Sequence, residues 1–229
     1  MTDYRTALII GAGPGISASL TRALTASGVR VAMAARDTFK LSDLAAETGA
    51  RAFSIVDAAD QFSIEQLFEE VDQGMGTPDV VVYNASARAH GPIAELDPNE
   101  VQRAISITAF GGFLAVHHAA KRMVPNGRGA ILLTGASASI KGFPHSAAFA
   151  MGKFALRGLA QSAARELGPK GIHVAHFIID GSVRKAGSSD PADGKLTPDA
   201  ISQSYMDVLK QPRDAWSHEV DLRPWAEKF

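Results

Sequence analysis

The stretch "TALIIGAGPGIS", Thr6–Ser17, decides the fold of this chain. Its first part, Thr6–Ala12, is a short apolar run that ends in glycine, which is typical of a buried strand in a parallel sheet. The second part opens a helix. Glycine at such a turn lets backbone amides approach a pyrophosphate, and the helix N-terminus favours its negative charge. The stretch therefore predicts a strand–turn–helix unit that binds a phosphate-bearing ligand.

The glycine spacing distinguishes two dinucleotide-binding patterns. The pattern GxGxxG fails because its sixth position is Ile16. The pattern GxxxGxG fits at Gly11 and Gly15, and Ser17 takes the place of the last glycine. A tight strand–helix turn needs glycine even without a ligand. The position of the turn directly after the first strand favours the phosphate interpretation.

Further apolar runs follow at intervals, with helical patterns between them. They are Val29–Ala35, Arg51–Asp57, Asp79–Ala85, Gly129–Ala136 and Ile172–Ile179, and "WSHEVDLRP" at Trp216–Pro224 adds a last strand. Such runs suit parallel strands that are covered on both faces. The alternation predicts an α/β fold of one domain, residues 1–229, in which a Rossmann-like, doubly wound parallel sheet lies between two helical layers.

Polar signals mark helix starts and one loose segment. Ser63–Gln66 has the spacing of a capping box, while Asp97–Glu100 and Thr197–Ala200 each place an N-cap before a proline. The segment Arg184–Leu196 is rich in Gly, Ser, Pro and Asp, which predicts a mobile loop. We expect a substrate loop or lid near residues 184–210.

Composition narrows the classes of function. The chain has 229 residues, no cysteine and a formal net charge of −1. No basic block points to nucleic acid, and no run reaches the roughly 20 apolar residues that span a bilayer. A thiol nucleophile is excluded, and no metal-ligand spacing occurs. We expect a soluble cytoplasmic protein that acts on a small molecule, without a metal, nucleic acid or membrane.

These motifs resemble the short-chain dehydrogenase/reductase family over nearly the whole chain. The resemblance rests on "GAGPGIS", on Asp57, and on "YNAS" at Tyr83–Ser86, where the family has Asn-Asn-Ala-Gly. It also rests on Lys153 in "FAMGK" and on "LAQSAARELGPKGIHV" at Leu159–Val174. The resemblance implies an oxidoreductase that uses a nicotinamide cofactor on a small carbonyl or alcohol.

The resemblance also implies a cofactor site. Asp57 would receive the adenine amino group, and Asn84 would hold the central strands and face the cofactor. Either side chain could instead cap its own loop. The implied cofactor-binding residues are Gly11, Gly13, Gly15, Ile16, Arg36, Asp57, Asn84, Ala85, Lys153, Gly181 and Val183.

The end of the second strand bears on the choice of cofactor. NAD enzymes of this fold place an acid there, on the ribose 2′-hydroxyl. Here the position holds Ala35, and Arg36 follows. An arginine can hold a 2′-phosphate in a charge-assisted pair, so we expect NADP(H) rather than NAD(H). The alternative is that Asp37 pairs with Arg36.

The family's catalytic set is Asn, Ser, Tyr and Lys, and the chain matches it incompletely. Spacing assigns Thr108 to the asparagine position and Phe149 to the tyrosine position. The serine position falls on Ala136 without a gap, or on Ser137 with one deletion. Lys153 is retained one helical turn after Phe149 and on the same face.

Phenylalanine has no proton to give to a carbonyl oxygen. Loss of a positioned general acid typically lowers the rate by ~10²–10⁴-fold. Lys153 can still bind ribose hydroxyls. Other candidate donors are His145, Asp180, in the turn where the family has Pro-Gly, and Tyr205. A solvated loop position explains His145 better than catalysis does, and packing explains Tyr205 better. A turn role explains Asp180 equally well.

Three functions remain open. The first is an NADP-dependent oxidoreductase with a displaced proton donor, the second a non-catalytic or regulatory NADP(H)-binding protein, and the third a dehydratase or isomerase. The segments Ala87–Ile93 and Arg184–Leu196 would frame the substrate pocket.

Small residues in the predicted helices Asn99–Val124 and Ser146–Leu167 permit close packing. The family pairs through these helices, so the resemblance implies a homodimer or homotetramer.

Overall fold

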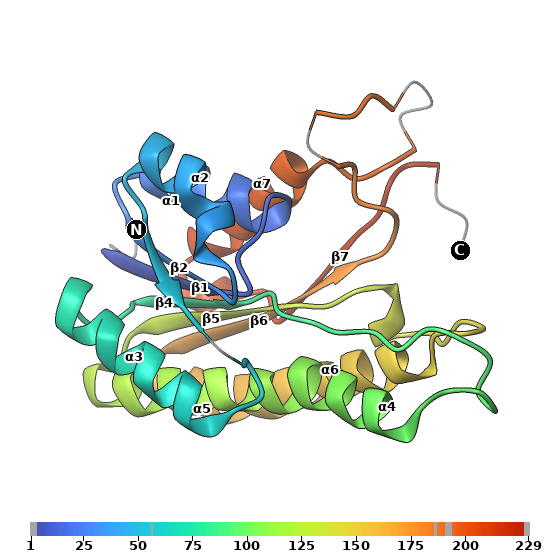
Figure 1. Ribbon diagram of the computed structural model, residues 1–229. Coiled ribbons are helices and arrows are strands. Elements are labelled where there is room, and N and C mark those ends of the chain that lie inside the picture. Colours follow the sequence, from blue (N-terminus) through green and yellow to red (C-terminus); the bar gives the residue numbers. More distant parts are fainter. Residues whose placement is uncertain (1–3, 56, 186, 191–193, 227–229) are drawn as a thin grey trace.

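A seven-stranded parallel sheet forms the centre of the protein (Figure 1). The computed structural model describes residues 4–55, 57–185, 187–190 and 194–226. The strand order is β3-β2-β1-β4-β5-β6-β7. The strands are β1 (Thr6–Ile10), β2 (Arg30–Ala35), β3 (Arg51–Ser54), β4 (Val80–Tyr83), β5 (Gly129–Thr134), β6 (Ile172–Ile179) and β7 (Glu219–Leu222).

The order of the strands reverses at the centre of the sheet. Strand β1 pairs with β2 on one side and with β4 on the other, both in parallel. Every residue of β1, β4, β5 and β6 is buried, because helices cover both faces. In such sheets ligands bind outside the carboxyl ends of the strands, at the point of reversal. The topology therefore places a binding site beyond the ends of β1 and β4.

Two helical layers cover the sheet (Figure 1). One face carries α1 (Ile16–Ala26), α2 (Ser42–Thr48) and α7 (Pro198–Leu209), and the other carries α3 (Gln61–Met75), α4 (Pro98–Ile105), α5 (Gly111–Met123) and α6 (Ala147–Leu167). Each layer encloses a separate apolar core against the sheet. The three-layer arrangement predicted from the sequence is confirmed. None of the helices in the described part of the chain is long and apolar enough to cross a membrane.

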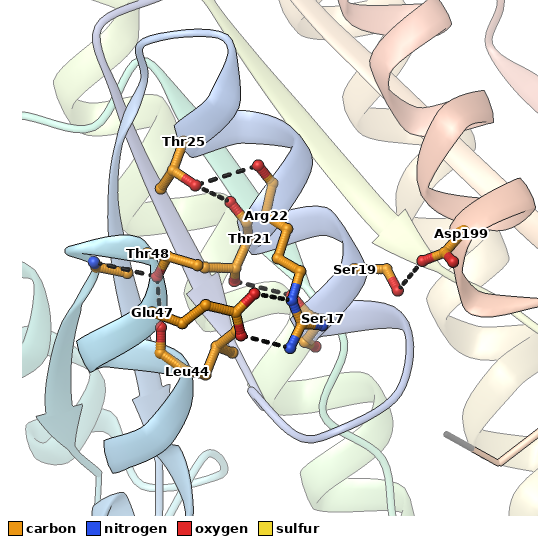
Figure 2. Close-up of polar contacts among 10 residues, drawn as sticks. Ser17, Ser19, Thr21, Arg22, Thr25, Leu44, Glu47, Thr48 and Asp199 are labelled. Carbon is orange, nitrogen blue, oxygen red and sulfur yellow. Dashed lines mark hydrogen bonds and ion pairs between the residues drawn. The ribbon is translucent and has the colours of Figure 1, made fainter. Parts of the chain in front are cut away.

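Helix α1, which follows the glycine turn, is anchored to two neighbours (Figure 2). The Arg22 guanidinium donates two hydrogen bonds to the Glu47 carboxylate of α2, at 2.7 and 2.8 Å. The Ser19 hydroxyl donates to the Asp199 carboxylate of α7 at 2.6 Å. Because both contacts lie in the first two turns of α1, they fix the helix end at which a phosphate is expected.

Helix starts were predicted correctly at two places and wrongly at a third. Asp97 and Thr197 are N-caps whose side chains accept hydrogen bonds from backbone N–H groups, as expected. Ser63 does not begin a helix. The N-cap of α3 is Asp60, whose carboxylate accepts the Ser63 N–H at 2.7 Å. The carboxylate cap lies three residues earlier and leaves Ser63 inside the first turn.

Several predicted boundaries were too long. Strand β1 ends at Ile10 rather than Ala12, and β3 ends at Ser54 rather than Asp57, because the chain turns into loops at the carboxyl edge of the sheet. The predicted helix Asn99–Val124 is divided by a π-helical turn at Ser106–Phe110. Within this turn the Ile107 carbonyl accepts a hydrogen bond from the Tyr83 hydroxyl. π-Helical turns often occur beside functional sites.

Candidate active site

A cavity of about 260 Å³ opens at the carboxyl ends of β1, β2 and β4. Its walls bring together five of the residues expected to bind a cofactor, namely Gly11, Arg36, Asp57, Asn84 and Ala85. These residues come from four separate loops. They meet because adjacent parallel strands end at the same edge of the sheet.

Different physical reasons explain why glycine stands at each position of the first turn. Gly11 has φ +85°, and a Cβ there would collide with the backbone of Ala85, so packing alone requires glycine. A Cβ at Gly13 or Gly15 would meet no atom within 4 Å. Packing within this chain therefore does not demand glycine at those two positions. A pyrophosphate that approaches the backbone at the N-terminus of α1 does, and the residues present fit a dinucleotide.

Ser17 and Asn84 connect the turn to the next strand. The Asn84 side-chain amide donates to the Ser17 hydroxyl at 2.8 Å, and that hydroxyl lies 3.4 Å from the Gly11 carbonyl oxygen. The Asn84 backbone N–H donates to the Ile10 carbonyl at 2.8 Å. Ser17 is buried in the position of the third glycine. Its hydroxyl thereby ties the end of β4 to the turn after β1.

Asp57 follows β3 and lines the cavity. One of its carboxylate oxygens accepts the Ala59 N–H at 2.9 Å, and the other lies 3.3 Å from the Arg103 guanidinium of α4. Asp57 therefore caps its own loop, and it also lines the cavity. The two roles that the sequence left open are structurally compatible.

The Asp37 carboxylate is engaged by groups other than Arg36. The Asp37 carboxylate accepts the Phe39 N–H at 3.2 Å and pairs with Lys40 at 3.2 Å. The alternative in which Asp37 neutralises Arg36 is wrong for this structure. Arg36 is exposed on the cavity wall next to Ala35.

Lys153 is a buried ionisable group of the site. Its side chain is 3% exposed, and its ammonium donates to the Thr134 carbonyl at the end of β5, at 2.6 Å. Burial, together with the charge of Arg88, lowers the pKa of Lys153 to about 7. Its bonded partner is a neutral carbonyl rather than a carboxylate. The ammonium is therefore nearly dry at the carboxyl edge of the sheet.

Phe149 lies close to two cations. It is 7% exposed, and its ring centroid lies 5.8 Å from the Lys153 ammonium nitrogen. The guanidinium carbon of Arg88 lies 3.9 Å from the same centroid. Sequence reasoning did not select Arg88. The available signal was its position in the segment Ala87–Ile93, which was expected to frame the substrate pocket.

Thr108, in the asparagine position, binds the backbone of a neighbouring loop. It is fully buried in the π-helical turn, and its hydroxyl accepts the Ala87 N–H at 3.1 Å. Gly152 of α6 packs against it closely, since a Cβ there would lie 2.8 Å from the Thr108 Cβ. Thr108 therefore positions the segment that carries Arg88.

The serines after β5 have different environments. Ser137 is half-buried at the start of a short turn, and its carbonyl accepts the N–H groups of Ile140 and Lys141. Ser139 is fully buried. Its hydroxyl accepts the Ala136 N–H at 3.1 Å and lies 3.4 Å from a ring nitrogen of His176.

His176 extends this network to Glu219 of β7, at 3.3 Å. Serine, histidine and glutamate in this order resemble a hydrolase triad. Because both Ser139 and His176 are fully buried, no substrate can reach the hydroxyl. Burial also lowers the pKa of His176 to about 4, which keeps the ring neutral. The network is structural and holds the loop that contains Ala136.

The remaining candidate donors are placed as follows. His145 is exposed, has φ 61°, and its carbonyl accepts the Gly91 N–H at 3.1 Å. Asp180 is 2% exposed and lies between Lys141 at 3.4 Å and Arg223 at 3.6 Å.

Tyr205 is fully buried on the other face of the sheet. Its hydroxyl lies 2.8 Å from the Thr134 hydroxyl, and its ring stacks on Phe177 with centroids 3.6 Å apart. Tyr205 therefore packs in the core. Beyond β6, Gly181 has φ 151°, and Val183 forms a parallel bridge with Leu196.

A family model described as short chain dehydrogenase matches residues 5–184. The chain belongs to this family. It is 30% identical to L-2,3-butanediol dehydrogenase of Corynebacterium glutamicum over 84% of this chain and 77% of the relative. A solved short-chain dehydrogenase from Rhodopseudomonas palustris has a TM-score of 0.83 and 33% identity, over 96% of this chain and 99% of that one.

A further short-chain dehydrogenase relative bears on the cofactor. It is a metagenomic short-chain oxidoreductase whose structure was solved in complex with NADP. It has a TM-score of 0.85 and 27% identity, and the match covers 97% of this chain and 98% of that one. Short-chain dehydrogenases are oxidoreductases that bind a nucleotide on a Rossmann-like fold, and the cavity at the reversal point of the sheet lies where such a nucleotide binds.

Proposed function

We propose that this short-chain dehydrogenase is an NADP-dependent oxidoreductase for a small carbonyl or alcohol, with an atypical proton-donor site. One observation carries the proposal. At Gly13 and Gly15 the backbone in front of α1 is bare, although no atom of the protein lies within 4 Å of where a Cβ would be. The pyrophosphate of a bound dinucleotide would occupy this space.

Arg36 supports the preference for NADP(H). It lies on the wall of the cavity, and the neighbouring carboxylate of Asp37 is engaged by Lys40 and the Phe39 N–H. The guanidinium is therefore available to a 2′-phosphate, which it would hold in a charge-assisted pair. The NADP-bound metagenomic relative is consistent with this preference.

The residues of the site divide the remaining tasks. The nicotinamide supplies or accepts the hydride when it is bound. Lys153 holds the ribose hydroxyls through an ammonium that the Thr134 carbonyl orients at 2.6 Å. Phe149, in the tyrosine position, offers no proton to the carbonyl oxygen, so the proton comes from water or from a displaced side chain. The predicted consequence is a slower reduction with intact cofactor binding.

The substrate would enter between two segments. Ala87–Ile93 carries Arg88, and Arg184–Leu196 follows β6 in the sequence, with residues 186 and 191–193 outside the part of the chain that the structure describes. Hydrogen bonds between Arg184 and Leu196 and between Leu196 and Ser182 close the base of the second segment. Helix α7 packs its buried face on the core, so the proposed lid is confined to the loop before that helix.

A sharp test uses the two glycines with open space. Gly13→Val would project a side chain into the proposed pyrophosphate position without meeting protein atoms. We expect NADPH affinity in calorimetric titration to fall at least tenfold while the thermal midpoint is unchanged. Gly158→Val is the matched control, because a Cβ at Gly158 also meets nothing within 4 Å. Equal NADPH binding by both variants would refute the proposed cofactor site.

A second candidate function follows from Phe149. A protein that binds NADP(H) without turnover, as a sensor or regulatory subunit, needs the phosphate turn and Lys153 but no phenol. In the tyrosine position, Phe149 instead packs against the Arg88 guanidinium, whose carbon lies 3.9 Å from the ring centroid. A screen of small carbonyl compounds with NADPH separates the two. Turnover of any of them supports the enzyme, and tight binding with none supports the sensor.

We also propose a homodimer or homotetramer. Helices α5 and α6 and the π-helical turn expose large apolar side chains, each with about half of its surface in solvent: Phe110, Phe113, Met151 and Phe154. The Phe113 ring stacks between those of Phe110 and His117. Exposed apolar side chains grouped on two neighbouring helices favour contact with a second copy.

A further inference from the structure

The Arg88 guanidinium lies beside Phe149 and near Lys153. Its guanidinium carbon lies 3.9 Å from the centroid of the Phe149 ring, so the ring occupies one face of the group. The side chain is exposed. Among the residues that the structure describes, it forms neither an ion pair nor a hydrogen bond. Its N–H groups, which point outward in the guanidinium plane, remain free to bind a ligand.

The surroundings of Arg88 carry an excess of positive charge. The charge of Arg88 acts on the buried Lys153 and contributes to lowering its pKa. The sequence contains no aspartate or glutamate from Asn84 to Ala94 or from Gly129 to Lys153. These segments include the loop that carries Arg88 and the loop before α6. The charges of Arg88 and Lys153 therefore have no carboxylate from these loops to neutralise them.

Among the residues that the structure describes, the buried carboxylate is that of Asp180, and it is already engaged. Asp180, at the carboxyl end of β6, lies 3.4 Å from the ammonium of Lys141 and 3.6 Å from the guanidinium of Arg223. Its two partners come from different loops, which hold it at the base of the site. It does not supply a counter-charge to Arg88, so the positive potential over the Phe149 ring is available to an anion.

The backbone that carries Arg88 is fixed on both sides. The Ala87 N–H donates to the buried Thr108 hydroxyl at 3.1 Å, and the Gly91 N–H donates to the His145 carbonyl at 3.1 Å. Ala89, between them, is buried against α4 and α6 in a small apolar cluster with Ala104 and Ala148. The cation is thus held on ordered backbone, which reduces the ordering cost of binding.

We propose that Arg88, supported by the Phe149 ring, binds an anionic oxygen group of the substrate, a carboxylate or a phosphate. The proposal rests on the proposed function and names its substrate class, a carbonyl or hydroxy compound that bears such a group. A planar guanidinium matches either anion with two parallel hydrogen bonds. Phe149 then has a role that tyrosine would fulfil less well, since an apolar ring leaves the donors of Arg88 to the ligand.

Calorimetric titration of the protein saturated with NADP⁺ tests this without turnover. The probes are 2-oxobutanoate, its neutral methyl ester and inorganic phosphate. We expect 2-oxobutanoate or phosphate to bind about tenfold to a hundredfold more tightly than the ester, the range for charge-assisted hydrogen bonds. The stronger of the two anions identifies the group. Arg88→Gln should abolish the preference, and Arg88→Lys should retain part of it.

Arg165→Gln is the matched control, because Arg165 is an exposed arginine farther along α6. It should leave the preference unchanged. Equal affinity of wild type for the acid, the ester and phosphate overturns the proposal. So does an equal loss for acid and ester in Arg88→Gln, which would mean that Arg88 contacts the carbonyl oxygen. A protein that does not bind NADP⁺ refutes the proposed function instead, and the same anion titrations on the protein alone then decide the role of Arg88.

Discussion

Replacement of Lys153 by methionine should stabilise the cofactor-free protein and flatten its dependence on pH. The ammonium is 3% exposed, and its bonded partner is the neutral Thr134 carbonyl. The desolvated charge is disfavoured, so burial lowers the pKa from 10.5 to about 7. Methionine fills a similar volume without a charge, and among the described residues the Thr134 carbonyl is the hydrogen-bond acceptor that loses the ammonium.

The direction in which stability changes with pH follows from how many protons each state binds. Between about pH 7 and 10.5 the unfolded chain holds the Lys153 proton and the folded chain has released it, so stability rises with pH. The cost is fully present below about pH 7 and is relieved as the pH rises to 10.5. The full shift corresponds to roughly 4–5 kcal/mol, and the part between about pH 7.5 and 9.5 to roughly 2–3 kcal/mol.

Other buried groups set the limits of the measurement. Burial lowers the pKa of His118, His173 and His176, so these rings are neutral at the start of the interval. Burial raises the pKa of Tyr83 and Tyr205. The unfolded chain then loses its tyrosine protons first, which lowers stability only near the unperturbed pKa of about 10 and above. The interval between these limits reports on Lys153.

Urea denaturation of wild type and Lys153→Met, measured in steps from about pH 7.5 to 9.5, provides the assay. The free energy of unfolding should rise by roughly 2–3 kcal/mol for wild type and stay nearly level for the variant. Lys121→Met, at an exposed position of α5, should retain the wild-type slope. Parallel pH profiles for wild type and Lys153→Met would show that the ammonium is not desolvated, and the argument from burial would be refuted.

Three further predictions concern the proposed function. Phe149→Tyr combined with Ala136→Ser should raise carbonyl reduction by as much as ~10²-fold in steady-state kinetics with NADPH affinity unchanged, because it restores a phenol beside Lys153; a slower variant would show that Phe149 belongs to a different mechanism. Arg36→Asp should reverse the preference for NADPH over NADH in calorimetry, and an unaltered ratio would exclude contact with the 2′-phosphate. Phe113→Glu should dissociate the proposed oligomer in light scattering, whereas Phe62→Glu, at an exposed position of α3, should not.

Most of the fold could be predicted because strand burial and helix capping are local signals. Strand β6 has the predicted bounds Ile172–Ile179, since it is apolar throughout and both ends are marked by turns. The cap at Ser63 was wrong because Asp60 offers a stronger acceptor three residues earlier. The strand ends were overestimated where residues such as Asp57 leave the ladder for a loop. Local patterns do not show where that departure occurs.

The site was predictable only where the sheet dictates it. Gly11, Arg36 and Asn84 follow strands that lie side by side, so their meeting follows from topology. Arg88 reaches the Phe149 ring of a helix that begins nearly sixty residues later in the sequence, and no spacing rule encodes that contact. The turn of Thr108 toward the Ala87 N–H likewise depends on the π-helical turn, which the sequence pattern of one continuous helix did not indicate.

The burial of Lys153 bears on both candidate functions. A lysine that is nearly dry and has no carboxylate partner costs the folded chain free energy, and methionine would occupy the same space without that cost. The burial is explained if a polar ligand satisfies the ammonium in the working state, since binding then offsets the cost. Enzyme and sensor both bind the cofactor, so Lys153 supports either.

The Phe149 ring and the free Arg88 guanidinium that packs on it distinguish the enzyme from the sensor, because a sensor has no need of a substrate anion. A carboxylate or phosphate bound at Arg88 would therefore favour the enzyme, with its proton supplied by a group other than a tyrosine.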